Sequence, residues 1–256
     1  MPGRRATTMA FAFRRSARAA APGTPVRHGG RMRAAAALGL LAGAAADAVF
    51  ADPRRGHPVA LFGRAAAALE RRLYAGSRAR GAAYAALCTG GAVALGLAAH
   101  ALTRNRPWGR AAVTAAATWA VLGGTTLGRE GAHLADALER GDLAAARARL
   151  PHLCGRDPSG LDEAELARAT VESVAENTSD AVVAPLVWGA VAGVPGLLGY
   201  RAVNTLDAMV GHRSPRYADF GWAAARLDDA ANLLPARLTA ALAVLAAPVA
   251  GGSPRR

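Results

Sequence analysis

The sequence contains no lysine, only two cysteines, and few aromatic side chains, at 5% of 256 residues. The formal net charge of +13 is therefore carried by arginine. Cys88 lies in an apolar run and Cys154 in a polar loop, and two such cysteines form neither a disulfide framework nor a zinc site. We expect two free thiols in a reducing compartment.

Several catalytic motifs are also missing. The sequence has no P-loop, no G-x-S-x-G elbow, no H-E-x-x-H and no kinase signature set. A nucleotide, if one is used, is therefore not held by a standard glycine-rich cradle. Alternating apolar and polar residues are absent, and β-branched and aromatic residues are sparse, which argues against strands. The sequence predicts an all-α protein.

The arginines suit more than one kind of anionic partner, including nucleic acid and lipid. They are scattered over loops and the N-terminus, and no helix-turn-helix, zinc-finger or RNA-binding signature accompanies them. We therefore expect no nucleic-acid partner. Arginine accumulates in the cytoplasmic-side loops of membrane proteins, so the bilayer is the expected partner.

Apolar segments at 34–51, 81–102 and 111–127 approach the length of about 20 residues that crosses a bilayer. Between membrane segments, residues 129–150 are charged, with leucines at helical spacing and a turn at Gly141. These features predict a polytopic integral membrane helical protein, multi-pass in the cell membrane, with a polar helical region between membrane segments. Residues 1–33 are predicted to be a disordered basic arm, and residues 34–256 the membrane domain.

The stretch from 172 to 237 holds most of the closely spaced acidic and amide residues. Such groups are costly to bury in apolar sequence, so they have partners or a function. They form three clusters: Glu172, Glu176, Asn177 and Asp180; Asn204 and Asp207; and Arg226, Asp228, Asp229 and Asn232.

Helical spacing groups these carboxylates on shared faces. Residues four apart lie on one face, so Glu172, Glu176 and Asp180 form an acidic stripe. Carboxylates this close repel one another unless a cation neutralises them, and Mg²⁺ prefers oxygen ligands. An exposed acidic helix face is the alternative. The predicted Mg²⁺ ligands are Glu176, Asp180, Asp228 and Asp229.

Two further segments carry candidate residues. Pro53 and Pro58 end the first apolar helix, which places Asp52 and His57 near the membrane surface, as helix caps or as part of a site. Arg213 lies in a proline-containing loop and is either a phosphate ligand or a membrane-surface charge.

The combined motifs are specific, although each alone is modest evidence. They are Asp52-Pro53 with His57-Pro58-Val59, Gly155-Arg156-Asp157, ESVAENTSD (172–180), YRAVNTLDAMVG (200–211), FGWAAARLDD (220–229) and NLLPAR (232–237). This pattern resembles the CobD/CbiB family of cobalamin-biosynthesis membrane proteins, the adenosylcobinamide-phosphate synthases. The family's Ser-Pro-Asn-Ala-Gly-Trp type motif and last membrane segment do not follow, so we expect the chain to lack the usual C-terminal segment.

The resemblance implies amide formation between a carboxylate of adenosylcobyric acid and aminopropanol or its phosphate, giving adenosylcobinamide or its phosphate. A carboxylate must be activated first, most simply as an acyl phosphate, so ATP and Mg²⁺ are the expected cofactors and the corrinoid is a substrate. The implied partners are the corrinoid, aminopropanol or its phosphate, the lipid bilayer, and a complex with other cobalamin-assembly enzymes.

Site roles are assigned on the same basis. His57 is the candidate general base for the ammonium group. The predicted catalytic residues are Glu172, Glu176, Asn177, Asp180, Asp207, Asp228, Asp229 and His57. The predicted substrate-binding residues are Asp52, Asn204, Arg213, Arg226, Asn232 and Arg237.

Two alternatives remain at this point. The D-D-x-x-N pattern from Asp228 is similar to the D-D-x-x-D of prenyl-transferring enzymes, so a membrane prenyl- or alcohol-phosphate transferase with aspartate-rich Mg²⁺ sites is one. That enzyme predicts a second full D-D-x-x-D motif. The other is a non-enzymatic permease or membrane assembly subunit, which predicts longer spans and an intramembrane charged pathway.

Overall fold

A computed structural model describes residues 25–52, 56–249 and 251. Within these residues the chain is helical and contains no strand, so the all-α prediction is confirmed. The α-helices are α1 (Pro25–Phe50), α2 (Pro58–Leu73), α3 (Arg78–Leu102), α4 (Pro107–Val121), α5 (Gly124–Glu139), α6 (Leu143–Arg149), α7 (Glu163–Thr178), α8 (Ala184–Leu206) and α9 (Trp222–Ala246). A short 3-10 turn η1 (Leu150–His152) and two π-helical turns, η2 (Ser179–Val183) and η3 (Asp207–Gly211), complete the order.

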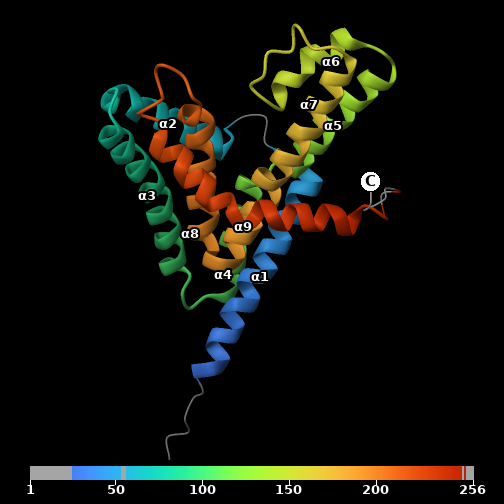
Figure 1. The fold of residues 1–256 in the computed structure, drawn as a ribbon. Coiled ribbons are helices and arrows are strands. Elements are labelled where there is room, and N and C mark those ends of the chain that lie inside the picture. The colour runs from blue at the N-terminus through green and yellow to red at the C-terminus, as the bar shows by residue number, and fades with distance from the viewer. Residues whose placement is uncertain (1–24, 53–55, 250, 252–256) are drawn as a thin grey trace, which may run out of the picture.

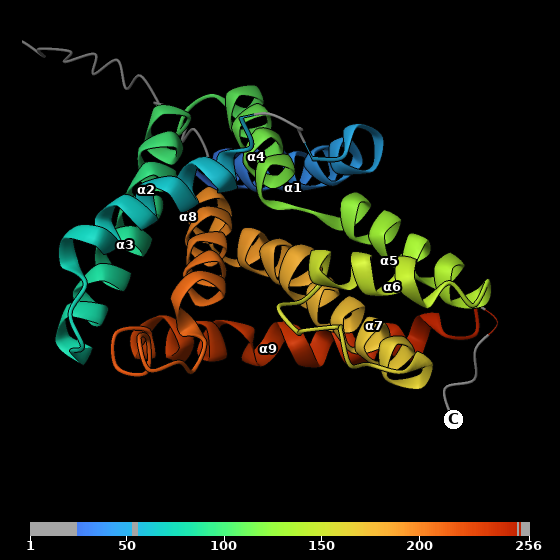
Figure 2. The same ribbon diagram turned by 90° about the horizontal axis from the view of Figure 1, so that it is seen from above.

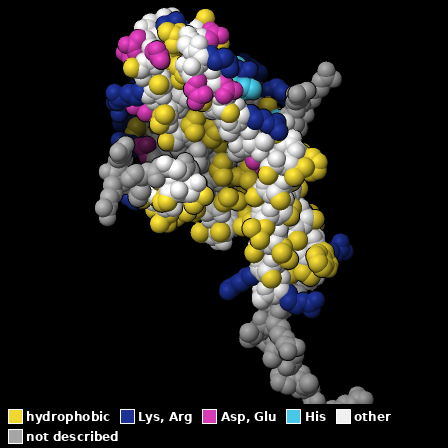
Figure 3. All heavy atoms as spheres, turned by 90° about the vertical axis from the view of Figure 1, so that its right-hand side faces the viewer, with side chains coloured by type: hydrophobic (Ala, Val, Ile, Leu, Met, Phe, Trp, Pro, Cys, Tyr) yellow, Lys and Arg dark blue, Asp and Glu magenta, His cyan; other side chains and the backbone are white. Residues whose placement is uncertain are grey.

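The helices form a bundle with a charged lobe at one end. Helices α1, α3, α4 and α8 make the bundle, and α5, α6 and α7 make the lobe at the upper right of Figure 1. In the space-filling view, acidic and basic side chains gather on the lobe and hydrophobic ones cover the lower part (Figure 3). Five stretches are long and apolar enough to cross a membrane: Gly29–Phe50, Arg78–Leu102, Pro107–Glu139, Glu163–Gly211 and Trp222–Ala246. The chain is therefore a multi-pass membrane protein.

Helix α1 begins earlier than the sequence analysis expects. It starts at Pro25, so residues 25–33 are helical rather than part of the predicted disordered arm. Proline suits the first helical position because its missing N–H needs no partner there. The remainder of the predicted arm, residues 1–24, lies outside the described residues.

Helix α8 is a hairpin rather than a straight rod. At 1.5 Å per residue, a straight helix would separate Asp180 from Asn204 by about 36 Å. Instead Asn204 Nδ2 lies 3.2 Å from Asp180 Oδ2. The chain reverses at Gly193, whose φ of 65° favours glycine, and Pro195 follows. Both polar ends of α8 therefore reach the side of the bundle where the lobe lies.

Two hydrophobic cores hold this arrangement. In the bundle, Tyr84 of α3 packs against Phe220 with ring centroids 5.1 Å apart, and Leu206 is buried beside them. In the lobe, Leu134 and Leu166 are fully buried between α5 and α7. The predicted helical hairpin of residues 129–150 is present as α5 and α6.

The loop between η3 and α9 is fastened to α2. The buried Glu70 accepts hydrogen bonds from Arg216 Nη2 at 3.1 Å and from the Tyr217 hydroxyl at 2.8 Å. The bond to Glu70 raises the pKa of the Arg216 guanidinium, which also lies 4.3 Å from the ring of Tyr74. This contact fixes the loop that precedes α9.

Candidate functional site

A polar groove lies between helix α9 and the C-terminal end of α7 with η2. Seen from above in Figure 2, α9 runs along one edge of the molecule and part of α7 overlaps it. Its volume is about 590 Å³. We call it the acidic groove because four carboxylates from two helices line it together with an amide and an arginine: Glu176, Asp180, Asp228, Asp229, Asn232 and Arg237. The structure thus brings together five residues from two separate sequence clusters, and with them Arg237, which was predicted to bind substrate.

Both π-helical turns carry an aspartate of the predicted site. Asp180 is in η2, directly after α7, and Asp207 begins η3, directly after α8. A π-helical turn holds an extra residue, so it changes the face on which the following side chains lie, and such turns are frequent at functional sites. Glu176 and Asp180, on either side of the start of η2, both line the groove.

Amide side chains fix two of the groove carboxylates. Asn204 Nδ2 donates to Asp180 Oδ2 at 3.2 Å, and Asn232 Nδ2 donates to Asp228 Oδ2 at 3.0 Å. The Tyr200 hydroxyl donates to Asn232 Oδ1 at 2.9 Å and so orients that amide. Hydrogen bonds from neutral amides hold the carboxylates in place without neutralising their charge.

Helix α9 has a proline beside the groove, and a tryptophan completes the hydrogen bond that this proline removes. Pro235 has no N–H, so the carbonyl of Ala231 lacks its usual helical donor. Trp188 Nε1 donates to that carbonyl at 3.1 Å. The bond attaches α8 to α9 next to Asn232.

Asp207 lies near the groove and depends on a neighbouring glycine. It is half-buried and within electrostatic range of Asp228, Asp229 and Glu176. A Cβ at Gly211 would lie 1.8 Å from Asp207 Oδ1. Only glycine at this position leaves space for the carboxylate.

Two predicted catalytic residues point elsewhere. Glu172 pairs with Arg168 at 2.7 Å and Arg156 at 3.6 Å on the exposed surface of α7. Asn177 Nδ2 donates to the carbonyls of Leu153 and Ser173, at 2.9 and 2.8 Å. These contacts place Glu172 on the lobe surface and give Asn177 a bracing role, and neither residue lines the acidic groove.

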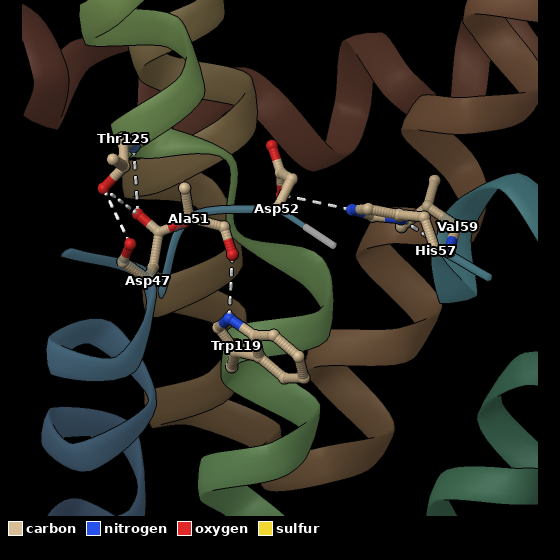
Figure 4. A network of polar contacts seen from close by, with 7 residues as sticks. All are labelled: Asp47, Ala51, Asp52, His57, Val59, Trp119 and Thr125. Carbon is tan, nitrogen blue, oxygen red and sulfur yellow. Dashed lines mark hydrogen bonds and ion pairs between the residues drawn. The ribbon is translucent and has the colours of Figure 1, made fainter. Parts of the chain in front are cut away.

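Asp52 and His57 form a second polar cluster, at the start of α2 (Figure 4). His57 Nε2 lies 3.1 Å from Asp52 Oδ1, and His57 Nδ1 accepts from the Val59 N–H at 3.2 Å. In the tautomer that these contacts assign, Nε2 carries the proton and Nδ1 caps the helix. Neither ring nitrogen has a free lone pair, so this geometry does not support His57 as a general base.

The same figure shows how the end of α1 is fastened to the start of α5. Buried Asp47 accepts hydrogen bonds from Thr125, through its backbone N–H at 3.0 Å and its hydroxyl at 3.2 Å. Trp119 Nε1 donates to the Ala51 carbonyl at 3.1 Å. These bonds position Asp52 beside the junction of α4 and α5.

Arg201, which is not among the predicted site residues, lies between the two clusters. It is within electrostatic range of Asp52 and of Asp180, and its Nη1 lies 3.4 Å from Asn204 Oδ1. Its buried Nε has no hydrogen-bond partner in the described part of the chain. One signal in the sequence could have identified it: Arg201 comes three residues before Asn204, on the same helix face.

Arg213 and Arg226 line a smaller pocket of about 130 Å³ beside the groove. Arg226 Nη1 is 3.5 Å from Asp229 Oδ2, and both side chains are exposed. Asp229 lines the groove and this pocket. The pocket therefore adds positive charge at one end of an otherwise acidic site.

The predicted Mg²⁺ ligands lie together, but they do not form a ready cage. Within the described ranges no group of three or more histidine, cysteine, aspartate or glutamate side chains is placed to hold a metal ion. Mg²⁺ usually takes only one or two carboxylates and completes its shell with water and phosphate. Asp228 Oδ1 is buried without a partner in the described structure, so the groove fits that mode of binding.

Comparison with known families gives one match over most of the chain. The model of a family described as CobD/Cbib protein matches residues 40–253. This range contains every residue of the acidic groove.

Curated relatives agree with that match. A "Cobalamin biosynthesis protein CobD" of Mycobacterium tuberculosis is 60% identical over 221 residues, which are 86% of this chain and 69% of the relative. Proteins with the same name from Geobacter metallireducens and Rhodobacter capsulatus are 47% and 44% identical, over 82% and 76% of this chain and 67% and 63% of their own lengths. No solved structure matches.

Proposed function

The chain belongs to the CobD/CbiB protein family, and on that premise we propose that it is a membrane-embedded enzyme of cobalamin biosynthesis. Its substrate is then a corrinoid, and the reaction takes place at the end of the bundle where the lobe lies. The observation that carries this proposal is the convergence of four carboxylates from α7, η2 and α9 in one groove.

The proposed reaction is amide formation. A carboxylate of adenosylcobyric acid is joined to the amino group of aminopropanol or its phosphate, which makes the enzyme an adenosylcobinamide-phosphate synthase. ATP with Mg²⁺ would supply the activation that a carboxylate needs before an amine attacks it. The protein's own contribution is to bind, orient and deprotonate.

The groove carboxylates suit a positively charged reactant. Asp228, with one buried oxygen free of protein partners, and Asp180, held by Asn204, face the same space. Such a pair attracts either a Mg²⁺–phosphate group or the ammonium of the amine substrate. An amine attacks only after it loses a proton, and Asp228 Oδ1 is the proposed acceptor.

Arg201 is proposed to bind a negatively charged group of a substrate, a carboxylate or a phosphate. Its guanidinium is close to both polar clusters, and its Nε is free to donate to an oxygen of a carboxylate or phosphate. Arg213 and Arg226, at the other end of the groove, are proposed to bind a phosphate.

The test is an amide-forming assay in membrane vesicles, with adenosylcobyric acid, the amine, ATP and Mg²⁺. Asp228→Asn keeps the shape and removes the charge, and we expect it to reduce the rate by 10²-fold or more, the range typical of an acid–base group, about 10²–10⁴. Glu172→Gln is the matched control, because it makes the same kind of change one turn before Glu176 on α7, outside the groove. A fully active Asp228→Asn variant would refute the site, and a wild-type chain that forms no amide would refute the reaction.

A further inference from the structure

Most of the large aliphatic side chains of α9 lie on one side of the helix, and the exposed Leu233 and Val244 lie on the groove side. At 100° per residue, all its groove-lining residues, from Asp228 to Ala243, fall within a sector of about 180°. Five leucines fall within about 80° on the opposite side, with the two sectors centred about 170° apart. They are Leu227, Leu234, Leu238, Leu242 and Leu245. We call this set the leucine stripe.

The leucine stripe is uncovered in the described structure. Its five side chains are between 40% and 74% exposed. Five large aliphatic side chains along one helix form a patch that water-facing helices rarely carry. In a multi-pass membrane protein, hydrocarbon is the available solvent for such a patch.

The direction of α9 differs from that of the bundle helices. In Figure 1 its C-terminal half runs horizontally away from the bundle, while α1 rises steeply beside it. Figure 2 shows the same half lengthwise along the edge of the molecule. Figures 1 and 2 are related by a turn about the horizontal axis, and the C-terminal half of α9 lies along that axis in both. This half of the helix therefore runs across the bundle.

The charges on α9 also disfavour a crossing. Although the helix is long and apolar enough to span, Arg237 lies near its midpoint and would be placed close to the centre of the bilayer. Asp228 and Asp229 would enter the hydrocarbon on the same helix. At the surface these groups face the groove, and Arg237 lies at the edge of the groove-lining sector.

We propose that α9 lies in the plane of the membrane surface, with the leucine stripe in the hydrocarbon of the lipid and the acidic groove open to water above it. An arginine at the edge of the polar face of an interfacial helix reaches lipid phosphates, as Arg237 is placed to do. A corrinoid in the groove would then rest against the membrane surface. The inference depends on the membrane location of the chain and not on the reaction.

The test is a spin-label scan of α9 in the full chain, with Cys88→Ser and Cys154→Ser as the background. One cysteine at a time is introduced from 233 to 246, labelled, and reconstituted in vesicles of phosphatidylcholine and phosphatidylglycerol. Collisions with oxygen report hydrocarbon, and collisions with a water-soluble nickel chelate report water. We expect the two signals to alternate with a period of 3.6 residues, with oxygen maxima at Leu234, Leu238, Leu242 and Leu245.

Spin labels at Leu87, Leu95 and Leu97 of α3 are the control, because these exposed leucines lie on a helix that runs along the bundle. The ratio of oxygen to nickel collisions at these labels, which reports depth in the bilayer, should change smoothly with position along α3. The same smooth change in α9, with one maximum near its middle, would show a crossing helix and overturn the proposal. Low collision rates with both reagents along the leucine stripe would show a covering protein and overturn it equally. If a cysteine variant does not fold, the next residue of the leucine stripe is used instead. The outcome is decided by the periodic pattern of the collision rates and not by any single position.

Discussion

Replacement of Trp188 by phenylalanine should weaken the junction of α8 and α9 through one hydrogen bond. The indole N–H is 3.1 Å from the Ala231 carbonyl, which has no helical donor because residue 235 is proline. Phenylalanine keeps an aromatic ring but donates nothing. The Ala231 oxygen is then left without a partner.

The size of the effect follows from the cost of an unsatisfied acceptor, about 1–3 kcal/mol when it is fully buried and less for this partly buried carbonyl. A second substitution isolates this contribution. In a Pro235→Ala background residue 235 regains its N–H and can bond to Ala231, so Trp188→Phe there should cost only the lost packing. We expect the free energies of unfolding to differ from additivity by about 1–2 kcal/mol.

The assay is reversible unfolding of the four proteins of this cycle in mixed detergent micelles. Packing losses from each single substitution appear in both backgrounds and cancel in the cycle. Additive free energies would show that the Trp188 bond does not replace the one that proline removes, and the explanation of the junction would be wrong.

Three further predictions concern other contacts. Gly211→Ala should reduce amide formation by displacing the Asp207 carboxylate, which a Cβ would approach to 1.8 Å; a variant with unchanged kinetics would contradict this. Thr125→Val removes the hydroxyl bond to Asp47 and should lower the free energy of unfolding by about 1–3 kcal/mol, as denaturant titration would measure. His57→Asn keeps a good helix cap, so it should retain amide-forming activity, whereas a loss of 10²-fold or more would restore His57 as a general base.

Helix content and the lobe follow from sequence because both depend on local patterns. The leucines of α5 to α7 recur at helical spacing, and the turn falls at Gly141, as expected for a short helical hairpin. The start of α1 was missed since the arginines around Pro25 suggested a disordered arm, although proline is favourable at a first helical position.

The site could be predicted in part. Glu176, Asp180, Asp228 and Asp229 converge because their helices meet, and the sequence showed these carboxylates to be unusual. Glu172 was grouped with them by helical spacing, but it lies one turn before Glu176 on α7 and pairs there with Arg168 and Arg156 on the lobe surface. Helical spacing shows which residues share a face and not how far along the helix a neighbouring helix reaches.

Contacts between residues far apart in the sequence could not be predicted, for a different reason. Arg201 gains its importance only when α8 folds back and brings it between Asp52 and Asp180. The bond from Trp188 to Ala231 likewise joins residues 43 positions apart. Helical periodicity orders neighbours along one helix and says nothing about which helices meet.

The hairpin in α8 also constrains how the protein is assembled in the membrane. Its two arms, 184–192 and 195–206, are about 14 and 18 Å long, well short of the roughly 30 Å of hydrocarbon. Neither arm can span the hydrocarbon alone, and the turn at Gly193 lies beside His100, close to the C-terminal end of α3. Helices α3 and α4 pack against α8, so the hairpin depends on these two longer helices for its place in the bilayer.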